Sequence, residues 1–304
     1  MTDVTILASS PPKHFTEPQR IDVGGLSVAY RRKGAGSATV FLHGAGTTRM
    51  WLPFYEAMSG GVDFVAPEHP GFGDTARPDW LEGFDDLVLH YRDLLDAFGF
   101  DRVHLVGFSL GGWIAAELAV FYPDRLRSLT LVTPVGLSVP GHPITDLFRV
   151  PPERIGQLLY NDRAEEYAEF LPDPHDVDAA VRGYTEFTTL ALLMWNPRSD
   201  RKLPRRLARV HCPALVVEPD EDRLVPREHF QRWAELLPDA RLARVSGATN
   251  PTGHALLMQE PDRAAATIGG FLRDAEEAGH RAQTGQGAHA APGGSAPRSE
   301  GAPA

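Results

Sequence analysis

The chain has 304 residues, of which 42% are hydrophobic and 23% are charged. These fractions are those of an ordinary globular protein, and a chain of this length can bury a substantial core in one or two domains. Its 40 acidic and 30 basic residues give a formal net charge of −10 at pH 7. Because phosphate binding requires a positive surface, this charge argues against nucleic acid and against an anionic membrane as the main partner.

Cys212 is the only cysteine in the sequence, which excludes an internal disulfide framework and fits a reducing compartment. Residues 1–20 contain no basic segment followed by an apolar one, so we expect no signal peptide. Nor does any apolar run approach the ~18 residues of a membrane span. The sequence therefore predicts a cytoplasmic protein without a membrane span, and it leaves the oligomeric state open.

Strand and helix patterns alternate along the chain. Residues 85–98 and 113–122 carry apolar side chains at helical spacing. Short apolar runs typical of strands occur at residues 26–30, 38–42, 62–66, 102–106, 129–132, 214–217 and 242–245. Alternation of this kind predicts a mainly parallel sheet that is covered by helices on both faces.

Residues 136–206 interrupt this alternation, because they contain no strand pattern. They carry helical patterns at 153–170 and 177–195, which are separated by prolines. An insertion of this length after a central strand predicts a cap over a functional site. We expect an apolar substrate pocket there, with lining residues that include Phe108, Phe187, Met194 and Trp195.

The composition shifts from about residue 274 onward to Gly, Ala, Pro, Ser, Gln and Glu, without apolar periodicity. Such a segment is expected to be a disordered tail. The predicted organisation is an N-terminal extension, an α/β core in two parts, a helical cap and this tail, at residues 1–20, 21–135 with 207–273, 136–206 and 274–304 respectively.

Residues 107–112 place Ser109 where a buried strand is expected to change into a helix. The strand pattern 102–106 precedes this segment, and the helical pattern 113–122 follows it and stops before a proline. A serine on so sharp a turn is lifted out of the sheet. Glycines two residues before and two residues after it avoid collisions with the neighbouring strand and helix. This context predicts a nucleophile elbow with Ser109 as the nucleophile.

A serine hydroxyl becomes a good nucleophile only when a base takes its proton and an acid orients that base. The loop after the strand pattern 242–245 ends in a histidine before a helix, so His254 is the expected base. The loop after 214–217 holds four carboxylates in five positions, and spacing alone does not choose among Glu218, Asp220, Glu221 and Asp222. The chain order is Ser109, acid, His254, as this type of elbow requires.

The same chemistry needs two donors for an oxyanion. The backbone N–H of Leu110 follows the nucleophile at a helix N-terminus, where the helix dipole also favours negative charge. The loop after the strand pattern 38–42 contains small residues, and we expect the backbone N–H of Ala45 to be the second donor. His43, in the same loop, is expected to brace the loop rather than to take part in the chemistry.

Several segments together resemble the α/β-hydrolase superfamily, and the resemblance covers nearly all of residues 21–272. It implies a mainly parallel eight-stranded sheet with helices on both faces and a helical cap insertion. In this superfamily the acid is the aspartate of a D-x-x-V-P turn, so the resemblance implies Asp222. The matching segments are residues 42–44, the Pro-Gly-Phe-Gly turn 70–73, the elbow 107–112, the turn 222–226, and residues 253–254 with 260–261.

Within the superfamily, the chain resembles the capped esterases and carbon–carbon-bond hydrolases. The haloalkane dehalogenase and epoxide hydrolase branches differ, because they have aspartate in place of Ser109. Phe108 stands where the ring-cleavage carbon–carbon hydrolases usually have asparagine, and Ala255 stands where they usually have tryptophan. These two departures favour an ester over a carbon–carbon bond. The loop 248–252 before His254 is longer than the usual one in this family, which affects the expected placement of the base in both cases.

The sequence therefore predicts a serine hydrolase that needs no cofactor or metal. It would cleave a small or medium, mostly apolar carboxylic ester or thioester through an acyl-enzyme. One alternative is cleavage of a carbon–carbon bond in a β-diketone-type substrate. Its carboxylate would pair with an arginine of the cap, the candidates being Arg149, Arg154, Arg163, Arg182 and Arg198. The other alternative is a ligand-binding protein of the same fold, in which the long loop displaces His254.

Overall fold

The computed structural model describes residues 13–173 and 175–286. Its centre is an eight-stranded sheet of order β1-β2-β4-β3-β5-β6-β7-β8. Strand β2 runs antiparallel to its two neighbours, and all other neighbouring pairs are parallel. The predicted fold class is thus confirmed. The strands are β1 (Gln19–Val23), β2 (Leu26–Lys33), β3 (Ala38–Leu42), β4 (Asp63–Pro67), β5 (Val103–Phe108), β6 (Leu126–Val132), β7 (Ala214–Glu218) and β8 (Ala240–Arg244).

Helices cover both faces of the sheet and form two apolar clusters with it. One cluster includes α2 (Phe84–Ala97), α3 (Leu110–Phe121) and α7 (Arg227–Leu236). The other includes α1 (Pro53–Ser59), α8 (Leu256–Gln259) and α9 (Pro261–Gln286). Strand β5 is buried along its whole length between these layers, as a central parallel strand should be. The carboxyl end of β5 is therefore held in place by packing on both faces of the sheet.

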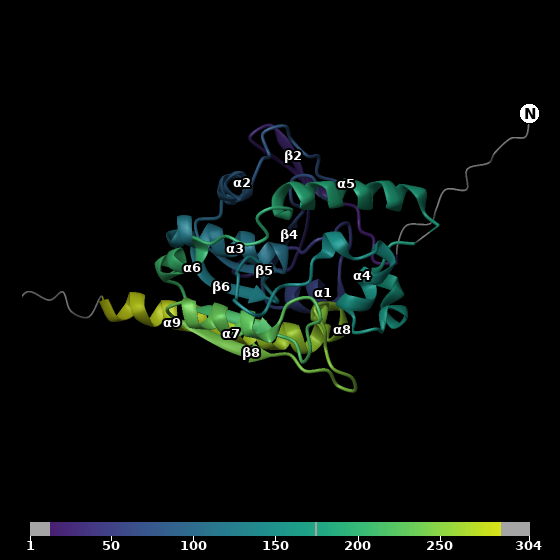
Figure 1. The fold of residues 1–304 in the computed structure, drawn as a ribbon. Coiled ribbons are helices and arrows are strands. Elements are labelled where there is room, and N and C mark those ends of the chain that lie inside the picture. Colours follow the sequence, from purple (N-terminus) through teal and green to yellow (C-terminus); the bar gives the residue numbers. More distant parts are fainter. Residues whose placement is uncertain (1–12, 174, 287–304) are drawn as a thin grey trace, which may run out of the picture.

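Residues 136–206 lie between β6 and β7 and contain α4 (Pro152–Leu159), α5 (Val177–Met194) and α6 (Leu203–Arg206). In Figure 1, α5 lies on the side of the molecule opposite to α9. The expected helix 153–170 is wrong as a single element. It ends after α4, and a 3-10 helix follows at Ala164–Phe170. The break occurs where Asn161 and Asp162 adopt positive φ angles of 55° and 57°, which a continuous right-handed helix does not allow.

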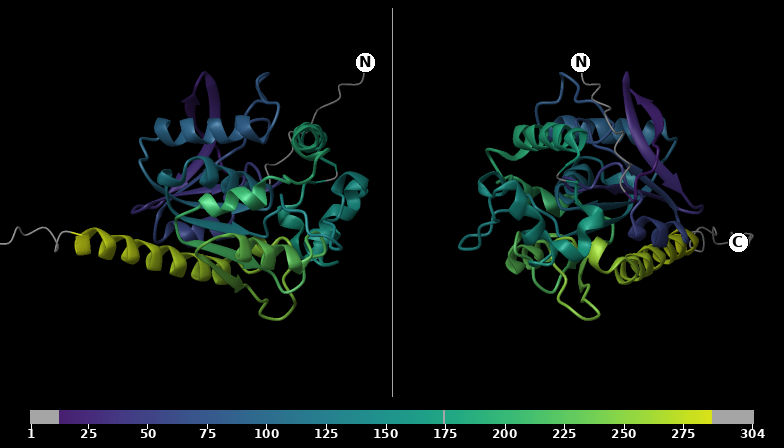
Figure 2. Two further views of the ribbon diagram at one scale, coloured as in Figure 1. Left: turned by 60° about the vertical axis from the view of Figure 1, so that its left-hand side comes forward. Right: turned by 90° about the vertical axis from the view of Figure 1, so that its right-hand side faces the viewer.

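The two ends of the described chain differ from the expectation. Strand β1 begins within the expected N-terminal extension. Helix α9 continues to Gln286 and extends beyond the sheet (Figure 2), so residues 274–286 are helical and the prediction of disorder is wrong for them. Helix-forming side chains and the i,i+4 ion pair of Glu277 with Arg281, at 3.5 Å, explain the continuation. Glu276 also contacts His104 of β5, at 2.8 Å. The rest of the expected tail, residues 287–304, lies outside the described residues, as do residues 1–12.

Candidate active site

Ser109 lies on a tight turn between β5 and α3, with φ 53° and ψ −111°. A positive φ is strained for a residue with a side chain, and such strain is typical of functional sites. The backbone N–H of Ser109 donates to the carbonyl of Val132, at 2.9 Å, which fixes the turn to β6. A Cβ on Gly111 would lie 2.0 Å from the Leu42 carbonyl oxygen, and one on Gly107 would lie 2.3 Å from a carbonyl oxygen of α3. The two glycines are therefore required by close backbone approach.

The structure brings Ser109, His254 and Asp222 into one hydrogen-bonded chain. His254 Nε2 lies 2.9 Å from Ser109 Oγ, and His254 Nδ1 lies 2.8 Å from Asp222 Oδ2. The other carboxylate oxygen of Asp222 accepts the backbone N–H groups of Leu224 and Val225, at 2.9 and 2.8 Å. Because a carboxylate only accepts, Nδ1 carries the proton, and Nε2 is left to accept the Ser109 hydroxyl. The Asp222 and His254 side chains are 1% and 2% exposed, so water does not compete for these bonds.

The other three carboxylates of this loop have different contacts. Glu218 is buried and pairs with Arg244 and Arg227, at 2.7 and 3.3 Å. Glu221 is exposed. Asp220 accepts three hydrogen bonds from the loop that precedes His254. Burial alone would raise the pKa of Asp220, but hydrogen bonds from the loop outweigh it and lower that pKa.

The loop before His254 is folded back on itself by these bonds. Asp220 accepts the Ser246 hydroxyl at 2.7 Å and the Gly247 N–H at 2.9 Å, and the Thr252 hydroxyl donates to the Val245 carbonyl at 2.6 Å. The N–H of Gly253 donates to Gln259 Oε1 at 2.6 Å. The loop is thus closed into a compact turn. The loop does not displace His254 from Ser109.

The two expected oxyanion donors belong to residues that line one cavity with Ser109. Ala45 comes from the loop after β3, and Leu110 is the first residue of α3. His43 Nδ1 lies 2.7 Å from the Gly44 carbonyl, and His43 Nε2 accepts the backbone N–H of His69 at 2.9 Å. Burial lowers the pKa of His43 to about 4, so its ring is neutral at neutral pH. Both ring nitrogens are engaged in holding the loop, which agrees with a bracing role.

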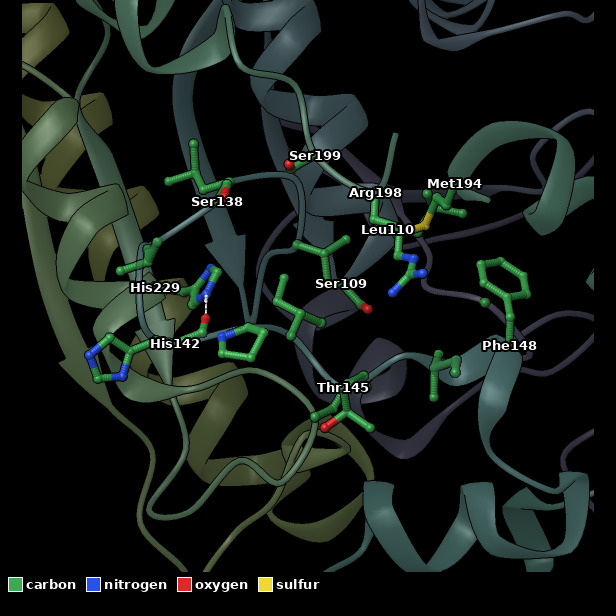
Figure 3. Close-up of a pocket in the computed structure, with 18 of the residues that line it drawn as sticks. Ser109, Leu110, Ser138, His142, Thr145, Phe148, Met194, Arg198, Ser199 and His229 are labelled. Carbon is green, nitrogen blue, oxygen red and sulfur yellow. Dashed lines mark hydrogen bonds between the residues drawn. The ribbon is translucent and has the colours of Figure 1, made fainter. Parts of the chain in front are cut away.

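A mostly apolar cavity of about 210 Å³ opens over Ser109 (Figure 3). Met194 lines it. Phe108, Phe187 and Trp195, all in the described part of the chain, do not line it. The centroid of the Phe108 ring lies 5.5 Å from that of the His254 ring. The ring centroids of Phe187 and Trp195 lie 5.2 and 5.1 Å from that of Phe148, which does line the cavity.

Most of the cavity wall was not predicted from the sequence. It comes from the irregular segment after β6, residues 135–148, which has no periodicity that could have indicated it. From this segment the cavity takes Val135, Leu137, Ser138, Val139, His142, Pro143, Ile144, Thr145, Leu147 and Phe148. Arg198 and Ser199 line both this cavity and a second one, of about 480 Å³, which Trp195 and Arg201 also line. Of the cap arginines, Arg198 is therefore the one at the cavity, where it pairs with Asp146 at 2.9 Å.

The described residues contain no group of three or more His, Cys, Asp or Glu side chains arranged to hold a metal ion. Nor does this part of the chain include a helix long and apolar enough to cross a membrane. A histidine hydrogen-bonded between a serine hydroxyl and a buried carboxylate is suited to proton transfer during nucleophilic attack. The geometry is thus that of a Ser-His-Asp triad.

A family model described as the alpha/beta hydrolase family matches residues 39–267. The chain belongs to this family. The resemblance to the α/β-hydrolase superfamily seen in the sequence is thereby confirmed.

Among curated relatives, the chain is 31% identical over 238 residues to the dihydrolipoyllysine-residue acetyltransferase component of the acetoin cleaving system of Cupriavidus necator. That match covers 75% of this chain but only 62% of the relative. The chain is 27% identical over 261 residues to the 2-hydroxy-6-oxo-6-phenylhexa-2,4-dienoate hydrolase of Comamonas testosteroni, covering 79% of this chain and 90% of the relative. Among solved structures, a meta-cleavage product hydrolase from Pseudomonas fluorescens has a TM-score of 0.70 at 21% identity and covers 85% of this chain and 98% of its own. This last likeness shows the fold.

Proposed function

We propose that this hydrolase cleaves a small or medium, mostly apolar carboxylic ester or thioester through an acyl-enzyme. The observation that carries the proposal is the unbroken hydrogen-bonded chain from Ser109 through His254 to Asp222. In this proposal Ser109 Oγ attacks the substrate carbonyl carbon while His254 Nε2 takes the hydroxyl proton. The backbone N–H groups of Ala45 and Leu110 stabilise the negative oxygen of the tetrahedral intermediate.

The intermediate then collapses, and His254 gives its proton to the leaving alcohol or thiol. An ester bond between Ser109 and the acyl group remains. Water, deprotonated by His254, attacks this ester, and the carboxylic acid leaves while Ser109 regains its proton. Asp222 keeps the His254 ring oriented and stabilises its protonated form in both halves.

The cavity supports a short acyl group. Its volume of about 210 Å³ is below the ~300–1,000 Å³ of sites for drug-sized ligands. The wall is mainly aliphatic and aromatic, which favours an apolar group. We assign residues 136–206 the role of a cap, because Phe148, Leu190 and Met194 from this segment close the space around Ser109.

The proposal is tested by labelling with a fluorophosphonate, which reacts with activated serines. We expect labelling of the wild-type protein at Ser109, located by mass spectrometry, and none in Ser109→Ala. Hydrolysis of a series of p-nitrophenyl esters and acyl thioesters should then show a preference for short chains. A folded wild-type protein that is not labelled would refute the proposal and would favour the ligand-binding alternative.

Carbon–carbon bond cleavage is the second candidate, and the relatives named as dienoate hydrolases favour it. Arg198, which lines the cavity and pairs with Asp146, is the proposed partner of a substrate carboxylate. Two departures from the pattern of ring-cleavage hydrolases count against it. The residue before Ser109 is Phe108 and the residue after His254 is Ala255, and both are buried. Turnover of a ring-cleavage product, measured by loss of its visible absorbance, would favour this candidate over the ester.

A further inference from the structure

Helix α5 turns one face toward the site and another away from it. Leu190 and Met194 line the cavity, whereas Tyr184 is 72% and Leu192 is 46% exposed. Glu186 lies one turn before Leu190 on the inward face, because residues four apart are neighbours on a helix. An acidic side chain on the inward face of a cap helix requires an explanation.

Glu186 attaches α5 to two loops of the core. Its Oε1 accepts the Thr48 hydroxyl at 2.7 Å and the Gly73 backbone N–H at 2.9 Å. Thr48 belongs to the loop after β3, residues 43–48, which we call the oxyanion loop because it contains Ala45. Gly73 belongs to the loop after β4. Through one oxygen, the cap helix is therefore connected to the segment that is expected to supply an oxyanion donor.

The charged groups around Glu186 do not neutralise it directly. Within the described chain, no cation lies within ion-pair distance of its carboxylate. Two charged groups act on Glu186 from a distance. Arg182 lies one turn earlier on α5, and Glu68 of the core pairs with Arg31 at 2.7 Å. Arg49 pairs with Asp74 at 2.9 Å. Burial is the main cause that raises the pKa of Glu186, and the carboxylate relies on two neutral donors.

A partly buried, unpaired carboxylate costs stability, so its place here is better explained by positioning than by strength of packing. We propose that Glu186 is a positioning residue that couples docking of the cap helix α5 to the geometry of the oxyanion loop. This inference rests on the proposed function, because it concerns the Ala45 donor.

The coupling follows from the path of the bonds. Thr48 is three residues from Ala45, and the hydroxyl of Thr47 donates to the Gly44 carbonyl at 3.2 Å, so a hydrogen-bonded turn spans Ala45 directly before Thr48. When α5 is docked, Glu186 holds Thr48 and thus the Ala45 N–H in place. When α5 lifts to admit substrate, Thr48 loses its acceptor. The oxyanion site is then complete only in the closed, water-poor cavity, which is where its donors stabilise charge most.

Substitution of Glu186 tests the proposal. Removing an oxyanion donor typically lowers kcat by ~10²–10³, and a loosened donor should cost less, so we expect Glu186→Ala to lower kcat on a short ester by about 10- to 100-fold. KM should change by less than about threefold, because the oxyanion contact forms in the transition state. Glu186→Gln keeps an acceptor oxygen and should retain most of the activity. Affinity for a trifluoromethyl ketone analogue should fall in parallel with kcat.

Thr48→Val removes the donor at the other end of the same bond. It should lower kcat to a similar extent. The kcat of the double variant with Glu186→Ala should be no lower than that of the less active single variant, because both substitutions remove the same Thr48–Glu186 hydrogen bond. Thr189→Val is the matched control. Its hydroxyl lies 3.1 Å from the carbonyls of Gly71 and of Thr185, so it contacts the loop after β4 and its own helix rather than the oxyanion loop. It should lower thermal stability and leave kcat close to that of the wild type.

Equal losses of kcat in Glu186→Ala and Thr189→Val would overturn the inference, since they would indicate only a weakened cap. The inference would also be overturned if the wild-type enzyme is active and labelled at Ser109 and Glu186→Ala has the same kcat as the wild type. A wild-type protein that is neither active nor labelled overturns the proposed function itself, and this inference with it.

Discussion

Replacement of Asp222 by asparagine changes one atom in the site and should invert the proton arrangement of His254. The oxygen of the new amide must stay with the N–H groups of Leu224 and Val225, which Asp222 Oδ1 now accepts at 2.9 and 2.8 Å. The opposite orientation would direct an NH2 group at two N–H donors. The NH2 group therefore faces His254 Nδ1, which must give up its proton to accept. Nε2 then carries the proton and no longer accepts the Ser109 hydroxyl.

The expected loss is large because both functions of the acid disappear together. The same substitution in a Ser-His-Asp hydrolase of another fold lowers kcat by ~10⁴, which corresponds to about 5.5 kcal/mol of transition-state stabilisation. The packing is unchanged, so the melting temperature should shift little. Initial rates on a p-nitrophenyl ester, with circular dichroism as the check on folding, measure both quantities.

Asp220→Asn is the matched control for this experiment. An asparagine there keeps an acceptor for the Gly247 and Thr252 N–H groups and can donate to the Ser246 hydroxyl, so the loop before His254 should stay folded. Its kcat should remain within about tenfold of the wild type, a change of less than about 1.4 kcal/mol. If Asp220→Asn lost more activity than Asp222→Asn, the assignment of the acid from the hydrogen bonds would be refuted.

Three further outcomes are expected. Burial raises the pKa of Glu117 from 4.5 to about 6, so the native state holds this proton more tightly than the unfolded chain, and stability falls as pH rises through this range. Glu117→Gln should therefore be up to about 2 kcal/mol more stable than the wild type at pH 7 and no more stable at pH 4, as measured by urea unfolding; a loss at pH 7 would contradict this. Gly111→Ala places a Cβ 2.0 Å from the Leu42 carbonyl oxygen and should lower the free energy of unfolding by at least about 2 kcal/mol. Gly61→Ala is the control, because its Cβ would meet nothing within 4 Å, and it should be nearly neutral in the same urea unfolding assay. Met194→Ala enlarges the cavity and should raise the ratio of kcat/KM for hexanoate over butyrate esters by about tenfold, and an unchanged ratio would place the acyl group elsewhere.

The parallel part of the fold could be predicted from the sequence, because buried strands are short apolar runs and β5 is buried throughout. Strand β1 was missed for the opposite reason. Its residues are mostly exposed, and the strand exists because it pairs with β2, which local sequence does not reveal. The same applies to α9 beyond residue 274, where a contact of Glu276 with β5 supports a segment whose composition alone is typical of disorder.

For the site, the chain order and the strand ends predicted Ser109 and His254, but not which carboxylate meets His254. Four acids in five positions are equivalent in spacing, and it was the resemblance to a D-x-x-V-P turn that implied Asp222. In the structure Asp222 reaches Nδ1, whereas Asp220 closes a loop. The pocket was predicted least well. Large apolar side chains of the cap were expected to line it, yet Trp195 is 60% exposed and Phe187 packs on Phe148. Helical periodicity identifies an inward face but does not tell a cavity from a core.

The cap contacts each of the loops that form the site, which changes how its role is understood. Thr145 binds the loop of the acid, donating from its N–H to Leu224 and from its hydroxyl to Arg223, both at 2.9 Å. Asn161 Nδ2 donates to the carbonyls of Glu221 and Thr252, at 3.1 and 3.3 Å, and so joins the acid loop to the base loop.

With Glu186 bonded to the oxyanion loop, the insertion contacts the loops of the proposed acid, base and oxyanion donor, while β6 of the sheet holds Ser109. A cap that only covered the substrate could be exchanged freely to change specificity. Because this cap also holds the loops in place, an exchanged cap must reproduce the contacts of Thr145, Asn161 and Glu186. Without those contacts, we expect the activity to be lost whatever substrate the new pocket fits.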